Sequence, residues 1–509
     1  MSLNSALSIA TSGLANINAQ FITMSQNVAN VSTPGYTEET TPQQSVTAGG
    51  IGMGVRTGIT TRATDVALQA ELSAQVSNSA GLTVTQAALQ AIDGVLGTPG
   101  QGDDLPSMVG SLQESFSTLL SDPSNQAQQS AVVNAAGGLA QTVNTISSTI
   151  TTQRQGVEDD LGVAVDSLNS TLSQIGQLNR EIVAGKQAGT STAGLESQRD
   201  GALQTLSGLV SFKALPQQDG SVQLVTASGL TLPTQADGAA FSFQGGAAAP
   251  QSYYPDGGLS GIALNGTDVT SALTGGRIGA DLTLRDTTLP TAQAQLDEFS
   301  YGLANRFSAQ GLTLFTDSQG NLPVATGTGG TQTGYVGFSA RIQVNPQVSA
   351  DPSLVRDGTT AIAGSSSGAS AFTPNPSGGP AGFSTLISRV LNYTFGDEAQ
   401  PGVSQPAPAS TALGPDGNLS APSGGVATLS GIATALVSGL SEQSATVTTN
   451  LTAANSLQSA LSSQLNSTTG VNLDSEMSKM VTLQTAYGAN ARVLSAVETM
   501  FNEILQVVT

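Results

Sequence analysis

The two ends of this chain carry matching helical heptad patterns, one over residues 3–31 and one over residues 480–508. Apolar residues recur there at alternating steps of four and three, which places them on one stripe of each helix. Asn490 is the only polar residue on the second stripe. We call the large apolar positions the terminal seam: Leu3, Leu7, Leu14, Ile17, Phe21, Met24, Val28, Val31, Met480, Leu483, Tyr487, Leu494, Val497, Phe501, Ile504 and Val508.

A helix with a single apolar stripe needs a partner. Each large side chain gains roughly 1.5–3 kcal/mol when it is fully buried, whereas ordering one residue of backbone costs about 1–2 kcal/mol. The two ends can pair with each other, in parallel or antiparallel, and simply close a globular protein. Alternatively, neighbouring copies of the chain complete the seam. The periodicity alone leaves both arrangements open.

Composition excludes several classes of function. The chain has 35 acidic and 15 basic residues and a net charge of -20, so neither nucleic acid nor an anionic membrane is an expected partner. The absence of Cys and His removes thiol nucleophiles, Ser-His-Asp triads and His-bound zinc. Catalysis by a pair of carboxylates, as in glycosidases, remains formally possible. Aromatic residues make up only 4% of the chain and Trp is absent, however, which leaves little aromatic surface for stacking a sugar substrate. We therefore expect no enzyme, no metal and no cofactor.

The N-terminal region lacks the features of a cleaved signal peptide. The first basic residue is Arg56, and no apolar run approaches the roughly 18 residues of a membrane span. We expect neither a cleaved signal nor membrane insertion. The weakly charged Ser/Thr/Gly-rich composition nevertheless resembles that of extracellular appendage proteins, which predicts export by a route that reads an uncleaved N-terminus.

The segments between the two ends follow a helix, insertion, helix order. Pro34 and Gly35 end the first helix, because proline disfavours helix in the preceding residue and glycine permits a turn. Residues 43–62 alternate weakly and are rich in glycine, which predicts an extended hairpin arm; no Lys-Ser or Lys-Thr follows to make a phosphate-binding loop. Helical periodicity over about 64–97, 104–121 and 125–185 predicts an elongated bundle.

A change of composition near Leu209 marks a β-rich segment. Residues 210–285 hold β-forming residues between turn signals such as Asp237-Gly238 and Asn265-Gly266. Helical periodicity returns at about 290–310, and the chain is helical again from about 430 to its end. Residues 311–428 are rich in Gly, Pro and Ser and include flexible-looking tracts such as residues 364–368.

These patterns predict an α+β multidomain fold with coiled-coil-like terminal helices, a long helical bundle and inserted β-rich outer domains. We expect a terminal helical domain from residues 1–40 and 470–509. An elongated helical domain with the hairpin arm comprises residues 41–208, 286–315 and 430–469. Residues 209–285 form a β-rich domain, and residues 316–429 form an outer region whose fold the pattern does not define.

Short motifs at both ends resemble those of the rod, hook and hook-associated proteins of the bacterial flagellum. The N-terminal motif directly follows the heptad helix, and the C-terminal motif opens the second one. Finding both in these positions makes chance unlikely. The motif residues are Ala29, Asn30, Thr33, Pro34, Gly35, Tyr36, Asn472, Leu473 and Asp474.

Internal segments narrow the resemblance to one hook-associated member of this family. Residues 195–210 resemble the helix before the β-rich insertion, and residues 275–311 are similar to the return into the helical layer. The sequence departs from the family pattern at Thr37-Glu38, where Ser-Arg is more usual, and at Gly488, where Gln is common. Because Glu38 is acidic where the family usually has Arg, the sequence does not define the electrostatic contacts of the region beyond the turn.

The resemblance implies a structural subunit that forms the junction ring between hook and filament, outside the cell. The terminal seam would be its polymerisation seam. Implied partners are other copies of the chain, the hook protein, the next junction or filament protein, the flagellar type III export apparatus and a chaperone on the C-terminal helix. Two alternatives remain: another axial subunit (hook, distal rod or flagellin-like), or a secreted adhesin-type surface protein.

Overall fold

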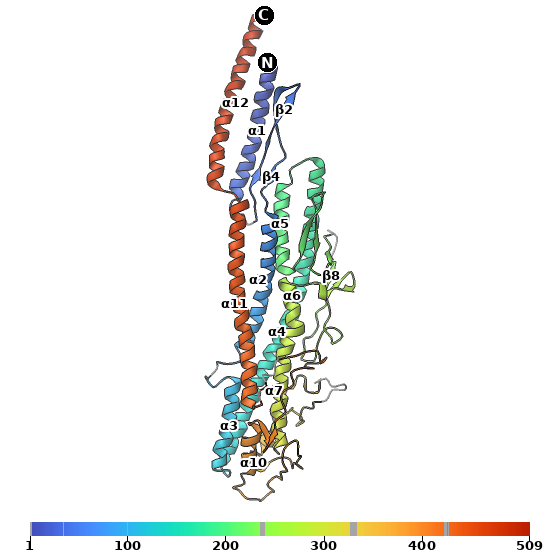
Figure 1. Ribbon diagram of the computed structural model, residues 1–509, viewed down its shortest axis with the longest axis vertical. Helices are drawn as coiled ribbons and strands as arrows, with labels where there is room; N and C mark the ends of the chain where they lie inside the picture. Colours follow the sequence, from blue (N-terminus) through green and yellow to red (C-terminus); the bar gives the residue numbers. More distant parts are fainter. Residues whose placement is uncertain are drawn as a thin grey trace.

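The computed structural model describes residues 3–508, apart from Pro34, Pro99, 235–239, 326–332, 422–424 and Val426, and it leaves out the side chains of Ile51, Val507 and Val508. The molecule is an elongated rod with both chain ends at the same end (Figure 1). Its α-helices are α1 (Leu3–Asn30), α2 (Val66–Asp93), α3 (Leu105–Ser121), α4 (Gln126–Ala188), α5 (Ala193–Leu209), α6 (Gly276–Thr283), α7 (Leu289–Ala309), α8 (Pro346–Ala350), α9 (Leu354–Asp357), α10 (Thr385–Arg389), α11 (Leu429–Thr469) and α12 (Leu473–Val508).

Helix α4 is the longest element and forms the backbone of the rod. At 1.5 Å per residue its 63 residues span about 95 Å. The Asn125 side chain caps its first turn, and Gly189 ends it in a left-handed conformation with φ of 69°. The predicted helical stretch at 125–185 is therefore confirmed as one helix. Helices α2, α3, α7 and α11 run along the rod beside it (Figure 1).

The strands form small antiparallel sheets on this helical frame. Strands β2 (Gln43–Ala48) and β3 (Ile51–Thr57) make the expected hairpin arm, in which Gln43 pairs with Thr57. The pairs β1 (Glu39–Thr40) with β4 (Thr61–Arg62), β11 (Phe315–Thr316) with β12 (Gln343–Val344), and β13 (Glu398–Gln400) with β14 (Val403–Ser404) are shorter still. Two three-stranded sheets join β5 (Lys213–Pro216), β6 (Val222–Val225) and β7 (Thr231–Leu232), and β8 (Phe241–Ser242), β9 (Ala263–Leu264) and β10 (Thr267–Asp268). The predicted α+β class with a helical bundle is confirmed.

The β-rich segment ends earlier than the sequence pattern indicated. We expected strands up to residue 285, but residues 276–283 are helix α6, which continues through the π-helical segment η2 (Leu284–Thr288) into α7. The alternation of apolar and polar residues at 281–285 resembles a strand, whereas Ile278 and Leu282, four residues apart, are buried on one helix face. Packing against α2 and α4 decides the outcome. The turn signal Asp237-Gly238 lies outside the described residues.

Residues 311–421 do not form a loose outer region where the structure describes them. They fold as short elements and turns over the far end of the rod, and their side chains enter the main hydrophobic core. Phe315, Phe338, Ile342, Leu386 and Val390 are at most 2% exposed. The sequence pattern did not reveal this packing, because apolar residues at irregular spacing give no periodic signal.

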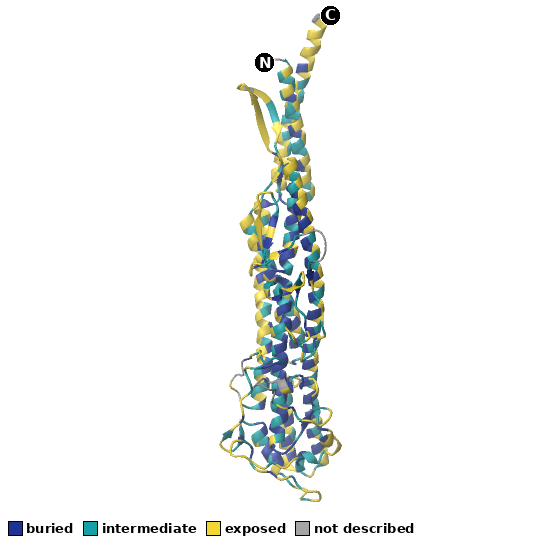
Figure 2. Ribbon diagram, turned by 90° about the vertical axis from the view of Figure 1, so that its right-hand side faces the viewer, coloured by how far each residue is buried: buried dark blue, intermediate teal, exposed yellow. Residues whose placement is uncertain are grey.

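Burial is uneven along the rod. Buried residues fill the half of the rod far from the termini, whereas exposed residues dominate the arm and the projecting end of α12 (Figure 2). The main core joins residues of α3, α4, α7 and α11 with the short elements at 311–395. The terminal end is thus the thinly packed part of the molecule.

Candidate polymerisation surface at the joined termini

Helices α1 and α12 lie side by side and run in opposite directions (Figure 1). Gly13 lies against Asn490, and the Asn27 Nδ2 donates to Glu476 Oε2 at 3.3 Å. Of the two pairings that periodicity left open, the structure has the antiparallel one. Helix α12 starts seven residues before the predicted residue 480, because Asn472 provides a cap there.

Only the smaller part of the apolar stripe of α1 is buried. Ala10, Ile17 and Met24, which recur every seven residues, are at most 6% exposed. Leu3, Leu7, Leu14, Phe21 and Val28 are partly exposed, and Val31 is exposed. The structure therefore brings these residues onto one side of α1, but α12 covers them incompletely.

The α12 seam is still less covered. Val497 is 3% exposed, whereas Tyr487, Phe501 and Ile504 are 44%, 38% and 54% exposed. Met480, Leu483 and Leu494 are partly buried. The side chain of Val508 lies outside the described residues.

A polar row on α1, which the sequence analysis did not identify, holds the hairpin arm and the segment before it. Ser12 Oγ accepts from the Val55 N–H at 3.2 Å, and Thr23 Oγ1 lies 2.6 Å from Thr41 Oγ1. The row recurs at steps of four and three beside the apolar stripe, and that repeat was the available signal. Its members are Ser12, Asn16, Gln20, Thr23 and Asn27.

The N-terminal motif is a turn that returns the chain to α1. Thr33 donates its N–H to Asn30 O at 2.8 Å and its hydroxyl to Asn30 Oδ1 at 3.2 Å. Gly35 has φ of +78°, a conformation that other residues rarely adopt. Ala29 is exposed, and Pro34 lies outside the described residues.

Asn27 is the centre of this turn. Its Oδ1 accepts from the Tyr36 hydroxyl and from the Glu39 N–H, both at 3.0 Å, and its Nδ2 donates to Glu39 O at 2.9 Å and to Glu476. Burial, with the nearby Glu39 and Glu476 carboxylates, raises the pKa of Tyr36 to about 12, so the phenol keeps its proton and remains a donor. One amide thus ties α1, β1, the motif turn and α12 together.

The C-terminal motif is a helix cap. Asn472 Oδ1 accepts from the Ser475 N–H at 3.1 Å, and Asp474 and Glu476 lie in the first turn, where acidic side chains favour the positive end of the helix dipole. Leu473, the apolar residue of the motif, is 46% exposed.

Glu38, which departs from the family pattern, forms an ion pair across the joint. Lys479 Nζ lies 2.5 Å from Glu38 Oε1 and 2.7 Å from Glu476 Oε1. Burial lowers the pKa of Lys479, but the hydrogen bonds to both carboxylates outweigh it and hold that pKa above its usual range. The Glu38 N–H also donates to Thr469 O at 2.8 Å, so residue 38 links the segment before β1 to both α11 and α12.

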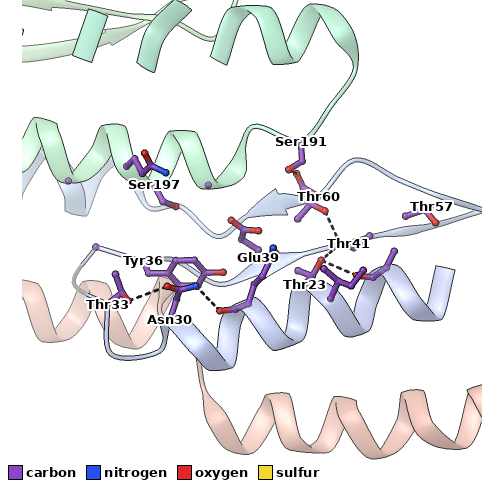
Figure 3. Close-up of a pocket in the computed structure, with 17 residues that line it drawn as sticks. Thr23, Asn30, Thr33, Tyr36, Glu39, Thr41, Thr57, Thr60, Ser191 and Ser197 are labelled. Carbon is purple, nitrogen blue, oxygen red and sulfur yellow. Dashed lines mark hydrogen bonds between the residues drawn. The ribbon is translucent and has the colours of Figure 1, made fainter. Parts of the chain in front are cut away.

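A cavity of about 770 Å³ opens beside this joint, between α1 and α5. Figure 3 shows Tyr36, Glu39 and Thr41 on one side of it and Ser197 on the other. Burial raises the pKa of Glu39, and the nearby Arg62 opposes that shift. Arg62 itself lies 3.2 Å from Glu196 and 2.5 Å from Asp200 on α5, which anchors the arm base to the rod.

The described part of the chain holds no cluster of metal-ligating side chains at this joint. Among those residues, no group of three or more acidic side chains could hold a metal ion. None of the helices described is both long enough and apolar enough to span a membrane. What the arrangement offers is protein surface: an antiparallel helix pair with uncovered apolar side chains.

Comparisons with known proteins identify relatives along the whole chain. Residues 89–322 match the flagellar hook-associated protein FlgK helical domain, and residues 462–507 match the flagellar basal body rod FlgEFG protein C-terminal model. Flagellar hook-associated protein 1 of Salmonella typhimurium is 26% identical over 99% of this chain and all of its own length; the Escherichia coli protein of the same name is 25% identical over the same shares. Its Bacillus subtilis namesake is 31% identical over 44% of this chain and 46% of its own.

A solved structure supports the fold. The flagellar hook junction protein FlgK from Burkholderia pseudomallei superposes with a TM-score of 0.54 at 16% identity, covering 78% of this chain and 99% of its own. The motifs at both ends, the helical rod between them and relatives that span the full length all agree. This chain therefore belongs to the flagellar hook-associated protein 1 family, whose members are structural flagellar subunits.

Proposed function

We propose that this chain forms the junction between hook and filament by polymerising through its paired terminal helices. The observation that carries the proposal is the apolar surface of α12. Its exposed large apolar residues are Leu473, Met477, Val481, Tyr487, Val493, Met500, Phe501, Ile504 and Leu505. A surface of this kind marks an interaction site in a soluble chain, since monomers seldom expose large contiguous apolar patches.

The projecting end of α12 is the strongest part of this surface. It extends beyond the start of α1 (Figure 1), so α1 cannot cover it. Burying Phe501 or Ile504 against another copy would contribute roughly 1.5–3 kcal/mol each. The half-covered α1 residues Leu14 and Phe21 add to the same surface.

In the assembled junction, the terminal domain would form the innermost layer, around the central export channel. The elongated helical domain and then the outer segments would form successive layers outside it. The domain division that supports this proposal is residues 1–40 with 470–509; 41–208 with 286–315 and 430–469; 209–285; and 316–429. Helix α6, at residues 276–283, favours moving the end of the third part from residue 285 to near residue 275.

Export precedes assembly in this proposal. The chain would leave the cell through the flagellar type III apparatus without a cleaved signal and act outside the cell beside the hook protein and the next junction or filament protein. Before export a chaperone would cover the exposed row of α12, because an amphipathic helix fits an apolar groove. Covering that row would also prevent premature polymerisation.

A matched pair of variants tests the polymerisation surface. Phe501→Asp places a charge on the exposed end of α12, and Thr499→Asp places the same charge two residues away at an exposed polar position. In a strain lacking the gene, we expect Thr499→Asp to restore filaments and Phe501→Asp to leave hooks without filaments and flagellin in the medium. Normal filaments with Phe501→Asp would contradict the surface, and filaments in the deletion strain itself would contradict the junction role and favour an adhesin.

A further inference from the structure

The apolar seam alone does not determine how far α12 lies along α1. Its members recur every seven residues on both helices, so sliding α12 by one heptad would again place apolar side chains against apolar side chains. The observed alignment must therefore be selected by residues that break the repeat. Asn490, the polar member of the α12 stripe, is one of them.

Gly13 of α1 forms a socket for Asn490. A Cβ at position 13 would lie 3.0 Å from Asn490 Oδ1 and 3.3 Å from its Cγ, which is tighter than an ordinary contact. Asn490 Nδ2 donates to Ala486 O of its own helix at 3.0 Å, so the orientation of the carboxamide is fixed. The missing side chain at position 13 is what lets the two helices approach here.

A second pair of residues, two heptads away along both helices, has the same alignment. Asn27 lies fourteen residues after Gly13 on α1, and Glu476 lies fourteen residues before Asn490 on α12. Both Asn27 and Glu476 are 1% exposed. Sliding α12 by one heptad toward its start would place the apolar Leu483 opposite Asn27 and move Glu476 past the end of α1, so the buried Asn27 amide would lose its hydrogen bond across the helix pair.

We propose that Gly13–Asn490 and Asn27–Glu476 form a register lock that selects one alignment of the two terminal helices. The lock sets how much of α12 projects beyond α1, and hence leaves Phe501 and Ile504 exposed (Figure 1). That consequence for assembly rests on the proposed function. The alignment itself does not, and it can be measured in the isolated chain.

Disulfide trapping measures the alignment directly, because the chain contains no Cys. Ala6 and Val497 lie one heptad beyond Gly13 and Asn490 in the observed register, so cysteines at both positions report it. Cysteines at Ala6 and Ile504 meet only after α12 slides by one heptad. Each pair is placed in the soluble full-length chain, oxidised mildly, and scored by gel mobility and by mass spectrometry of the linked peptides.

With the lock intact we expect the 6–497 link and no 6–504 link. Asn490→Leu restores an unbroken apolar stripe, and Gly13→Leu fills the socket; each is expected to lower the yield of the 6–497 link and to produce the 6–504 link. Ala489→Leu, which adds the same side chain at an exposed neighbouring position, should behave like the unaltered chain. A 6–497 link formed at the unaltered rate in both lock variants overturns the proposal, and so does its absence when the lock is intact. Since no outcome depends on filament growth, failure here leaves the junction role standing.

Discussion

Asp281 offers the most quantitative prediction about stability. Its side chain is fully buried on α6, and neither carboxylate oxygen has a hydrogen-bond partner among the described residues. Burial raises its pKa to about 7; Arg277, whose Nε lies 3.7 Å away, opposes the shift, and Asp160 on α4 adds to it. The folded protein therefore holds a proton that the unfolded chain releases near pH 4.

The size and sign of the effect follow from this difference. The pKa of Asp281 rises from its ordinary value of 3.8 to about 7 on folding. At about 1.4 kcal/mol for each unit of pKa, this rise corresponds to about 4 kcal/mol of unfolding free energy. Because the pKa of the folded state is raised, the contribution of the neutral acid is fully present below about pH 4. It is lost as the pH rises to about 7 and beyond.

Asp281→Asn removes this titration while nearly preserving the shape of the side chain. We expect the variant to match the parent protein near pH 4 and to exceed its unfolding free energy by up to about 4 kcal/mol near pH 8. Asp160→Asn is the matched control: its carboxylate is 51% exposed and pairs with the same Arg277 at 2.8 Å, so we expect a change below about 1 kcal/mol. Urea unfolding followed by helical circular dichroism at several pH values measures both. A difference between Asp281→Asn and the parent that does not change with pH would refute the reasoning.

Four further predictions concern the termini and the core. Limited proteolysis of soluble chain should remove α1 and α12 before the rod, because few of their apolar residues are buried; resistance of residues 3–30 would contradict this. Leu14→Asp should abolish filament assembly with the rod still folded by circular dichroism, whereas Ala15→Asp at the neighbouring exposed position should not. Lys479→Ala leaves the buried Glu476 carboxylate without its cation, so hydrogen exchange at the start of α12 should accelerate, and Arg492→Ala is the exposed control. Phe307→Ala, in the main aromatic cluster, should lower the unfolding free energy by about 3–5 kcal/mol in a denaturation assay.

Periodicity predicted the features that repeat along the chain. The heptads at both ends, the stretch at 125–185 and the glycine-rich arm at 43–62 correspond to α1, α12, α4 and the β2–β3 hairpin. The direction of the terminal pair was not predictable, because an apolar stripe meets a parallel and an antiparallel partner equally well. It became clear only through directional contacts, such as the hydrogen bond from Asn27 to Glu476.

Features built from single distant contacts escaped the sequence analysis. The hydrogen bond of Asn27 with Glu476 and the ion pair of Glu38 with Lys479 join segments from opposite ends of the chain, which no local pattern connects. The same holds for residues 311–395, whose Phe and Ile side chains reach the main core from irregular loops. The polar row of α1 was visible as a repeat, but a row of Ser, Thr and Asn residues also describes an ordinary solvated face.

The two halves of the rod depend on different interactions, and this separates folding from assembly. In the far half, apolar residues of α3, α4 and α7 are almost fully buried, so the rod is stabilised by its own core. At the terminal end, α1 fully buries only Ala10, Ile17 and Met24 among the apolar side chains described there. Hydrogen bonds and ion pairs fix the geometry of that end, but each contributes only about 1 kcal/mol. Polar contacts thus align the two terminal helices, but most of their apolar side chains stay uncovered. Burying those side chains against another copy of the chain would supply most of the hydrophobic stabilisation that this end lacks in the monomer.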